Sequence, residues 1–264
     1  MEINKESSVR KTVYYIAGGL VFLFMLFYMI VSLLSPGRKI DKIKREYGYK
    51  QSEKAQLDGR IFSDSSFISI NREKAYYQAR VIMAESDSIS LALNLPDSTA
   101  VLEINGVAVH KAGISTMKIS NVFSSADEYS LTSMLSNPFT IVNYYSTLRK
   151  EPVMIKLAPK DTSEYKPDIL PDTARVESVY YMFEMENGVR LYIYQNTDEK
   201  EKGGMKLFMF DLNDRIRNMH DNLRSISRLK VPEYHPAIRI RMKKADARII
   251  YRALPKNGMV TLFR

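Results

Sequence analysis

Hydrophobic residues dominate one uninterrupted stretch near the start of the chain. Residues 12–34 read TVYYIAGGLVFLFMLFYMIVSLL and carry no charge, with basic residues close by on both sides. At ~1.5 Å per residue, a helix of this length extends about 34 Å, enough to cross a hydrocarbon core of roughly 30 Å. A cleaved signal peptide has a shorter apolar run and a small-residue cleavage site, which residues 32–36 lack. The pattern predicts an uncleaved transmembrane anchor after an N-terminal tail of residues 1–11.

A basic segment, residues 37–60, follows the anchor. Ile40, Ile43 and Tyr47 recur there at helical spacing, so a short helix is expected to end near Gly48. The lysines and arginines of this segment indicate a juxtamembrane stalk that meets lipid headgroups.

Apolar and polar residues alternate over much of residues 61–157, which is the period of half-buried strands. Residues 66–70 and 77–83 show this alternation, although the good helix formers in residues 73–84 leave a helix as the alternative. Residues 89–95 alternate cleanly and end at a Pro-Asp turn signal.

The clearest local signal in this half is VLEINGVAV, residues 101–109. Two apolar-rich runs flank an Asn-Gly pair, which suits the positive φ angles of a type I′ turn, so a hairpin is predicted. A short helix within residues 120–135 and strands over residues 139–145 and 153–157 are expected to follow. Short strands separated by turns predict a β-rich, sandwich-like domain.

Residues 158–175 interrupt the pattern with three prolines among polar and charged residues, as in a linker or a long surface loop. Beyond them, residues 179–195 again flank an Asn-Gly pair and predict a second hairpin. Residues 198–204 read as a loop, and residues 205–210 could extend the sheet.

The last part of the chain mixes helical and strand periods. Apolar residues spaced by four, three, four and three predict an amphipathic helix: Leu212, Ile216, Met219, Leu223 and Ile226. A half-exposed strand over residues 238–243, a helix over residues 244–254 and a strand over residues 258–263 complete a compact domain of residues 176–264. The predicted fold class is therefore α+β, with an N-terminal transmembrane helix, a sandwich-like middle domain and a small α+β C-terminal domain.

Positive charge is concentrated at the C-terminal end. The net charge is +9, and residues 205–264 hold 14 Lys or Arg against five acids, whereas residues 51–204 hold 16 against 21. Nine basic residues could form one surface for an anionic partner, or only a solvated face: Arg215, Arg224, Arg228, Arg239, Arg241, Lys243, Lys244, Arg248 and Arg252. No nucleic acid is expected, because no RNP-type motif or recognition-helix signature accompanies them.

Signatures of catalysis and metal binding are absent from the sequence. The chain has no cysteine, and His110, His220 and His235 lie far apart without zinc-ligand spacing. There is no nucleophile elbow, Walker A motif or G-x-G-x-x-G motif. Glu184 and Glu186 share a strand face, a spacing common on solvated strands. We therefore predict a non-enzymatic protein with no catalytic residues, no metal site and no cofactor.

The side of the membrane that the body faces has two interpretations. More Lys and Arg follow the anchor than precede it, which favours a cytoplasmic body. A short tail, one anchor and a large cysteine-free domain favour an exported body. We prefer the second: a single-pass protein of the inner (cytoplasmic) membrane with an extracytoplasmic body. The expected partners are the lipid bilayer and another envelope protein or an anionic envelope polymer.

Residues 238–263 carry a family resemblance. Ile240-Arg241-Met242, Asp246-Ala247, residues 250–255 and Val260-Thr261-Leu262 resemble the closing stretch of L,D-transpeptidases. In that family a histidine and a catalytic cysteine precede the Ile-Arg-Met-like run. Here Arg239 stands where the cysteine is expected, and His235 precedes Pro236 instead of glycine. The resemblance implies a wall-binding protein that has lost the thiolate chemistry.

These observations favour a non-enzymatic, membrane-anchored envelope protein that binds or scaffolds envelope partners. Two alternatives remain. One is a catalytically inactive, transpeptidase-like cell-wall-binding protein, and the other is a membrane adaptor that faces the cytoplasm.

Overall fold

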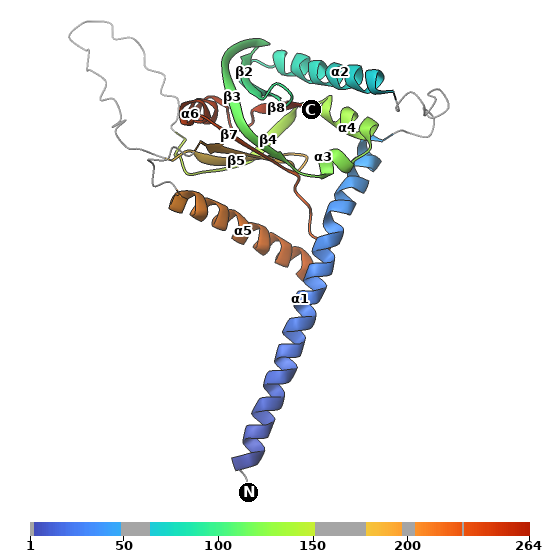
Figure 1. Ribbon diagram of the computed structural model, residues 1–264, viewed down its shortest axis with the longest axis vertical. Helices are drawn as coiled ribbons and strands as arrows, with labels where there is room; N and C mark the ends of the chain where they lie inside the picture. The colour runs from blue at the N-terminus through green and yellow to red at the C-terminus, as the bar shows by residue number, and fades with distance from the viewer. Residues whose placement is uncertain (1–2, 49–63, 151–177, 197–203, 229) are drawn as a thin grey trace, which may run out of the picture.

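The computed structural model describes residues 3–48, 64–150, 178–196, 204–228 and 230–264 (Figure 1). The helices are α1 (Ile3–Tyr47), α2 (Ser65–Ala84), α3 (Val122–Ser125), α4 (Glu128–Leu135), α5 (Gly204–Ser227) and α6 (Lys244–Ala253). The strands are β1 (Ser90–Asn94), β2 (Thr99–Ile104), β3 (Val107–Ile119), β4 (Phe139–Ser146), β5 (Tyr180–Met185), β6 (Arg190–Gln195), β7 (Ala237–Met242) and β8 (Met259–Phe263). The predicted strand at residues 153–157, the linker at 158–175 and most of the loop at 198–204 lie outside the described residues.

The eight strands close into one barrel in the order β1-β2-β3-β7-β6-β5-β4-β8. The mixed α and β class is confirmed, but the sandwich predicted for the middle region is wrong. Four strands come from residues 61–157 and four from residues 176–264, so the two regions share one sheet. The joins are the parallel pair of β1 with β8 and the antiparallel pairs of β3 with β7, β4 with β5 and β4 with β8. Alternation identifies the buried side of a strand but not its distant partner, which is why closure was missed.

The barrel interior is a packed core. Alternate residues of each strand point inward, and together they form one cluster of buried side chains, as expected for an eight-stranded barrel. Figure 1 shows α6 on one side of the barrel and α3 and α4 on the other. Tyr251 of α6 and Phe123 of α3 both belong to the core cluster, so helices extend it at both of these sides.

Both predicted hairpins are present, with different turns. Asn105 (φ 50°) and Gly106 (φ 78°) adopt the positive φ angles of the predicted type I′ turn. In the second hairpin only Gly188 has positive φ, at 77°, and its amide donates to the Met185 carbonyl at 2.8 Å. This is a three-residue loop closed by a left-handed glycine.

Residues 65–84 form a helix, so the strands predicted at 66–70 and 77–83 are wrong and the helical alternative was the better one. The Asp64 side chain caps the helix by accepting from the Ser66 amide at 2.9 Å. Tyr76, Ala79 and Met83 recur at helical spacing and are buried. Tyr77 and Val81 also alternate with polar neighbours in phase with Ala79 and Met83, which predicted a strand, but both are exposed in the helix.

α1 is the one helix, among the residues that the structure describes, that is long and apolar enough to cross a membrane. Its side chains from Tyr14 to Ile30 are largely exposed. Beyond them one face turns toward the barrel, with four buried residues spaced by four: Val31, Ser35, Lys39 and Ile43. The predicted stalk helix therefore continues α1 and packs on the body, and Lys39 does not meet solvent as a headgroup-binding lysine would.

α5 begins at Gly204, so the strand predicted at residues 205–210 is wrong, whereas the amphipathic helix over residues 212–226 is confirmed. Ile216, Met219 and Leu223 of its apolar stripe are exposed, whereas Ile226 at the end of the stripe is buried. The opposite side of the helix faces the barrel, through Leu207, Phe210 and Asp214. This side faces the barrel because its polar residues form hydrogen bonds with residues of β6.

Candidate functional site

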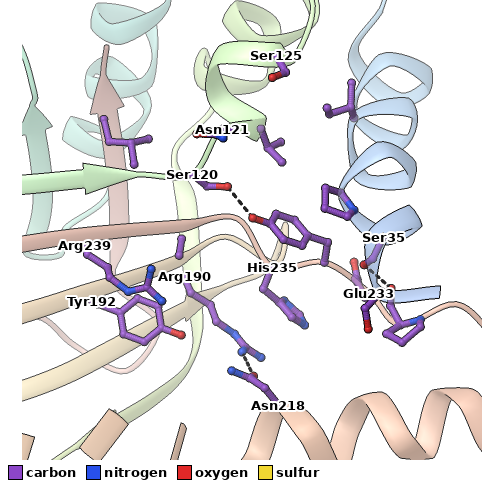
Figure 2. Close-up of a pocket in the computed structure, with 18 of the residues that line it drawn as sticks. Ser35, Ser120, Asn121, Ser125, Arg190, Tyr192, Asn218, Glu233, His235 and Arg239 are labelled. Carbon is purple, nitrogen blue, oxygen red and sulfur yellow. Dashed lines mark hydrogen bonds between the residues drawn. The ribbon is translucent and has the colours of Figure 1, made fainter. Parts of the chain in front are cut away.

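Two neighbouring cavities form a basic groove between α5, α1 and the outside of the barrel. The first, about 650 Å³, lies where α1 and α5 approach β3, β6 and β7 (Figure 2). The second, about 560 Å³, continues along the same strands beside α5. Lys118, Tyr192 and Arg239 line both cavities, so we treat them as one groove.

Strand alternation positions the cations of the groove. On β7, Ile238, Ile240 and Met242 are buried in the barrel, so Arg239 and Arg241 point outward. Lys118 on β3 lies opposite Arg239 in the antiparallel ladder. Arg215 of α5 lines the same groove from the other wall. Four cations from three elements therefore converge on one surface.

Two tyrosines of β6 form the floor beside these arginines. Tyr192 is paired in register with Arg239, and Tyr194 with Arg241. The guanidinium carbons lie 5.0 and 5.6 Å from the respective ring centroids, within cation–π distance. The rings therefore hold both arginine side chains in place along the groove.

The tyrosine hydroxyls fix α5 over the barrel. Tyr192 donates to Asp214 Oδ2 at 2.9 Å, and Tyr194 donates to Asp211 Oδ1 at 3.2 Å. Burial, followed by the nearby Asp214 carboxylate, raises the pKa of Tyr192 to about 12, so its hydroxyl remains a donor at neutral pH. Asp211 and Asp214, the two acidic residues that α5 contributes to the groove, are thus engaged by the barrel.

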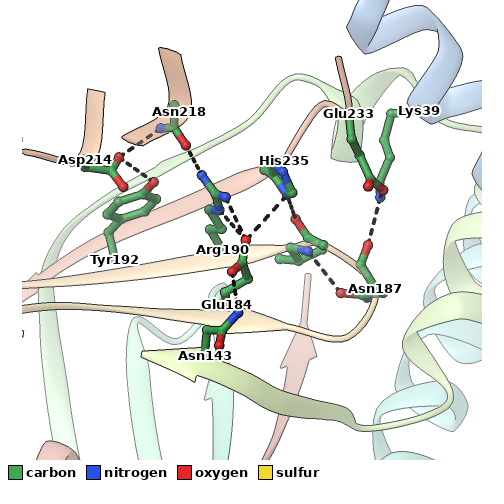
Figure 3. Close-up of polar contacts among 12 residues, drawn as sticks. Lys39, Asn143, Glu184, Asn187, Arg190, Tyr192, Asp214, Asn218, Glu233 and His235 are labelled. Atoms are coloured by element: carbon green, nitrogen blue, oxygen red, sulfur yellow. Dashed lines mark hydrogen bonds and ion pairs between the residues drawn. The ribbon is translucent and has the colours of Figure 1, made fainter. Parts of the chain in front are cut away.

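A buried ion pair supports the groove from behind (Figure 3). Arg190 donates from Nε and Nη2 to Glu184 Oε1 at 2.9 and 2.7 Å, and from Nη1 to Asn218 Oδ1 of α5. Asn143 donates to the other Glu184 oxygen at 3.0 Å. Burial opposes ionisation of Glu184, but the hydrogen bonds from Asn143 and Arg190 outweigh it and lower its pKa. Glu184, expected on a solvated face, is therefore a structural ion-pair partner.

The end of the groove at α1 is tied by a second polar cluster. Lys39 Nζ donates to the Asn187 carbonyl at 2.8 Å and lies 3.4 Å from Glu233 Oε1. His235 Nδ1 lies 3.0 Å from the Gly188 carbonyl oxygen and 3.8 Å from Glu184. Burial and the adjacent Arg190 lower the pKa of His235, which keeps the ring neutral at pH 7.

Among the described residues, no group of three or more His, Asp or Glu side chains could hold a metal ion. No protein-family model, curated protein or solved structure matches this chain. The resemblance of residues 238–263 to L,D-transpeptidases stays a prediction. In the structure this stretch forms β7, α6 and β8, and Arg239, at the position of the family's cysteine, lines the basic groove.

The nine basic residues predicted as one surface occupy separate places. Arg215, Arg239 and Arg241 line the groove. The other six lie on the C-terminal part of α5 and just beyond it, or on and beside α6, and do not line either cavity: Arg224, Arg228, Lys243, Lys244, Arg248 and Arg252. Lys118 was missed, because only the pairing of β3 with β7 brings it to Arg239.

Proposed function

We propose that this protein is a single-pass, membrane-anchored binding protein that holds a segment of an anionic envelope polymer in the basic groove and catalyses no reaction on it. One observation carries the proposal: Lys118, Arg215, Arg239 and Arg241 line one groove although they come from three separate elements. Such a concentration of basic side chains raises the local positive potential and attracts anionic ligands.

An extended polymer suits the shape of the groove better than a compact small molecule does. Its two cavities adjoin at Lys118 and Arg239 and are open along the outside of the barrel. A chain with repeated negative groups can meet the cations one after another, while a small ligand would occupy one cavity only. Because these charge contacts are open to solvent, dissolved salt screens them. Binding of the polymer is therefore expected to weaken as salt is added.

The proposal places the anchor in α1 and the body outside the cytoplasm. The exposed, uncharged side chains of α1 support the anchor. Topology is tested with Asp87→Cys, an exposed position in a chain without cysteine, labelled by a membrane-impermeant thiol reagent in intact cells. Labelling in intact cells is expected. Labelling only after lysis would overturn the extracytoplasmic placement and favour a cytoplasm-facing adaptor.

Binding is tested on the full chain in nanodiscs of zwitterionic lipid, so that no anionic headgroup competes. The probe is polyphosphate, with neutral dextran as the reference polymer. The groove variant is Lys118→Glu with Arg239→Glu. The matched control is Lys111→Glu with Lys256→Glu, which makes the same change in net charge at exposed positions outside the groove.

The groove variant is expected to weaken polyphosphate binding much more than the control does. An exposed charge contact contributes ~0.2–1 kcal/mol, and each reversal replaces an attraction by a repulsion. Two reversals therefore cost about 2 kcal/mol, or roughly thirtyfold in affinity. Equal weakening in both variants would show that only the net charge of the protein matters, and it would overturn the groove as the binding site.

A further inference from the structure

The outward side of α5 is apolar along most of its length. Six residues there are between 39% and 71% exposed: Met205, Phe208, Met209, Ile216, Met219 and Leu223. At about 100° per residue they fall on one side of the helix. Exposed basic residues border this side, with Lys206 and Arg224 along one edge and Arg215 along the other. An apolar side with basic edges is the composition of a helix that lies in a membrane surface.

The orientation of α5 is fixed by its other side. Asp214 and Asp211 accept hydrogen bonds from the two β6 tyrosines, and Asn218 accepts from Arg190. Rotating the helix to bury its apolar side would break all of these bonds and leave the two tyrosine hydroxyls and Arg190 of the barrel facing apolar side chains. The apolar side therefore stays exposed as long as α5 stays on the barrel.

α5 meets α1 near the end of the uncharged segment. Asn222 of α5 donates to the Tyr28 hydroxyl at 3.4 Å, and the Ser35 hydroxyl donates to the Pro232 carbonyl at 2.8 Å, just after α5. Residues 12–31, up to Val31, which is the first buried residue among those of α1 whose burial the structure describes, extend about 30 Å as a helix, which is the thickness of a hydrocarbon core. The boundary of a bilayer crossed by α1 would thus lie at the level of α5.

We propose that α5 lies in the surface of the bilayer that α1 crosses, with its apolar side among the upper acyl chains. Figure 1 shows the barrel on one side of α5 and the N-terminal length of α1 extending from the other. The apolar side of α5, opposite the barrel, therefore faces the same layer as the exposed part of α1. Lys206 and Arg224 then reach the headgroups. The inference rests on the proposed function only in its claim that α1 is a membrane anchor.

The test measures the depth of single labels in the full chain, at one copy per nanodisc. Phe208→Cys and Met219→Cys carry a fluorophore on the apolar side of α5, and lipids carry a nitroxide quencher at different acyl positions. Val81→Cys is the matched control, since it is an apolar residue, 59% exposed, on α2, which Figure 1 places on the opposite side of the barrel. Phe22→Cys on α1 reports the anchor itself.

Labels at Phe208 and Met219 are expected to be quenched by the lipids at a depth of roughly 5–10 Å below the headgroups, and the label at Val81 to be unquenched. Quenching at Phe22 without quenching at Phe208 and Met219 would overturn the inference while leaving the anchor intact. A second sample holds two copies per disc. Shielding of both α5 labels from lipid in that sample, together with coupling between the labels of the two copies, would also overturn the inference, because a second copy would then cover the helix.

Discussion

The closed barrel predicts that damage to β1 spreads to β5 and β6, although these strands lie far apart in the sequence. Leu93 of β1 is fully buried in the barrel core and lies in register with Leu262 of β8. Leu93→Ala removes a buried isobutyl group and leaves a cavity, at a cost of about 3 kcal/mol. Because one core serves all eight strands, this loss applies to the whole barrel.

Hydrogen exchange of the full chain in nanodiscs measures this spread. A loss of about 3 kcal/mol in global stability accelerates exchange through global unfolding by roughly a hundredfold. Peptides from β5 and β6 are expected to accelerate as much as those from β1 and β2. The reciprocal change, Ile193→Ala in β6, is expected to accelerate β1 and β2 in the same way, since Ile193 is also fully buried in this core.

Faster exchange in β1 and β2 alone after Leu93→Ala would contradict a core shared by all eight strands. Exchange that is unchanged over residues 180–195 would mean that the two halves unfold separately, each with its own core. The shared sheet would then contribute little to cooperativity.

Three further changes test local parts of the structure. Hydrogen bonds from Arg72 lower the pKa of Glu128, so the pair stabilises the fold above the unfolded-state pKa and is lost as pH falls through the lower folded value. Glu128→Gln should therefore remove about 1 kcal/mol at pH 7 and less at pH 3, measured by urea unfolding at both pH values. Gly188→Ala should cost about 1–2 kcal/mol in the same assay, because φ is +77° and a Cβ would lie 3.1 Å from Lys39 Nζ. Lys39→Met should lower the unfolding temperature, since the Asn187 carbonyl loses its donor; an unchanged temperature would refute this role.

The sequence predicted the local elements well where one short signal determines the structure. The two Asn-Gly hairpins need only the residues of each turn and its flanking strands. The amphipathic pattern from Leu212 to Ile226 also gave a correct helix. The pattern does not say what the apolar stripe faces, because this depends on what the opposite side of the helix contacts. Here that side carries Asp211 and Asp214, which bind tyrosines of β6.

Long-range pairing could not be predicted from periodicity. Closure of the barrel depends on β8 reaching both β1 and β4, and nothing in the alternation of those strands names a partner. The groove likewise depends on pairing between strands that are far apart in the sequence. Arg239 and Arg241 were predicted from their outward register, whereas Lys118 lies outside the basic C-terminal segment and joins them only through β3 and β7. Only Arg215, Arg239 and Arg241 of the nine basic residues line the groove, because the other six lie on the C-terminal part of α5 and just beyond it, or on and beside α6.

Labelling of arginines in the presence of polymer tests the central claim most directly, since it locates the bound chain. The full protein in nanodiscs is treated with phenylglyoxal, with and without polyphosphate, and modified residues are quantified by mass spectrometry. Arg215 and Arg239, both exposed in the groove, are expected to be protected by polyphosphate, while the exposed Arg252 on α6 is modified equally in both samples. Equal protection of all three arginines, or protection of none, would contradict the basic groove as the site where this protein holds its anionic partner.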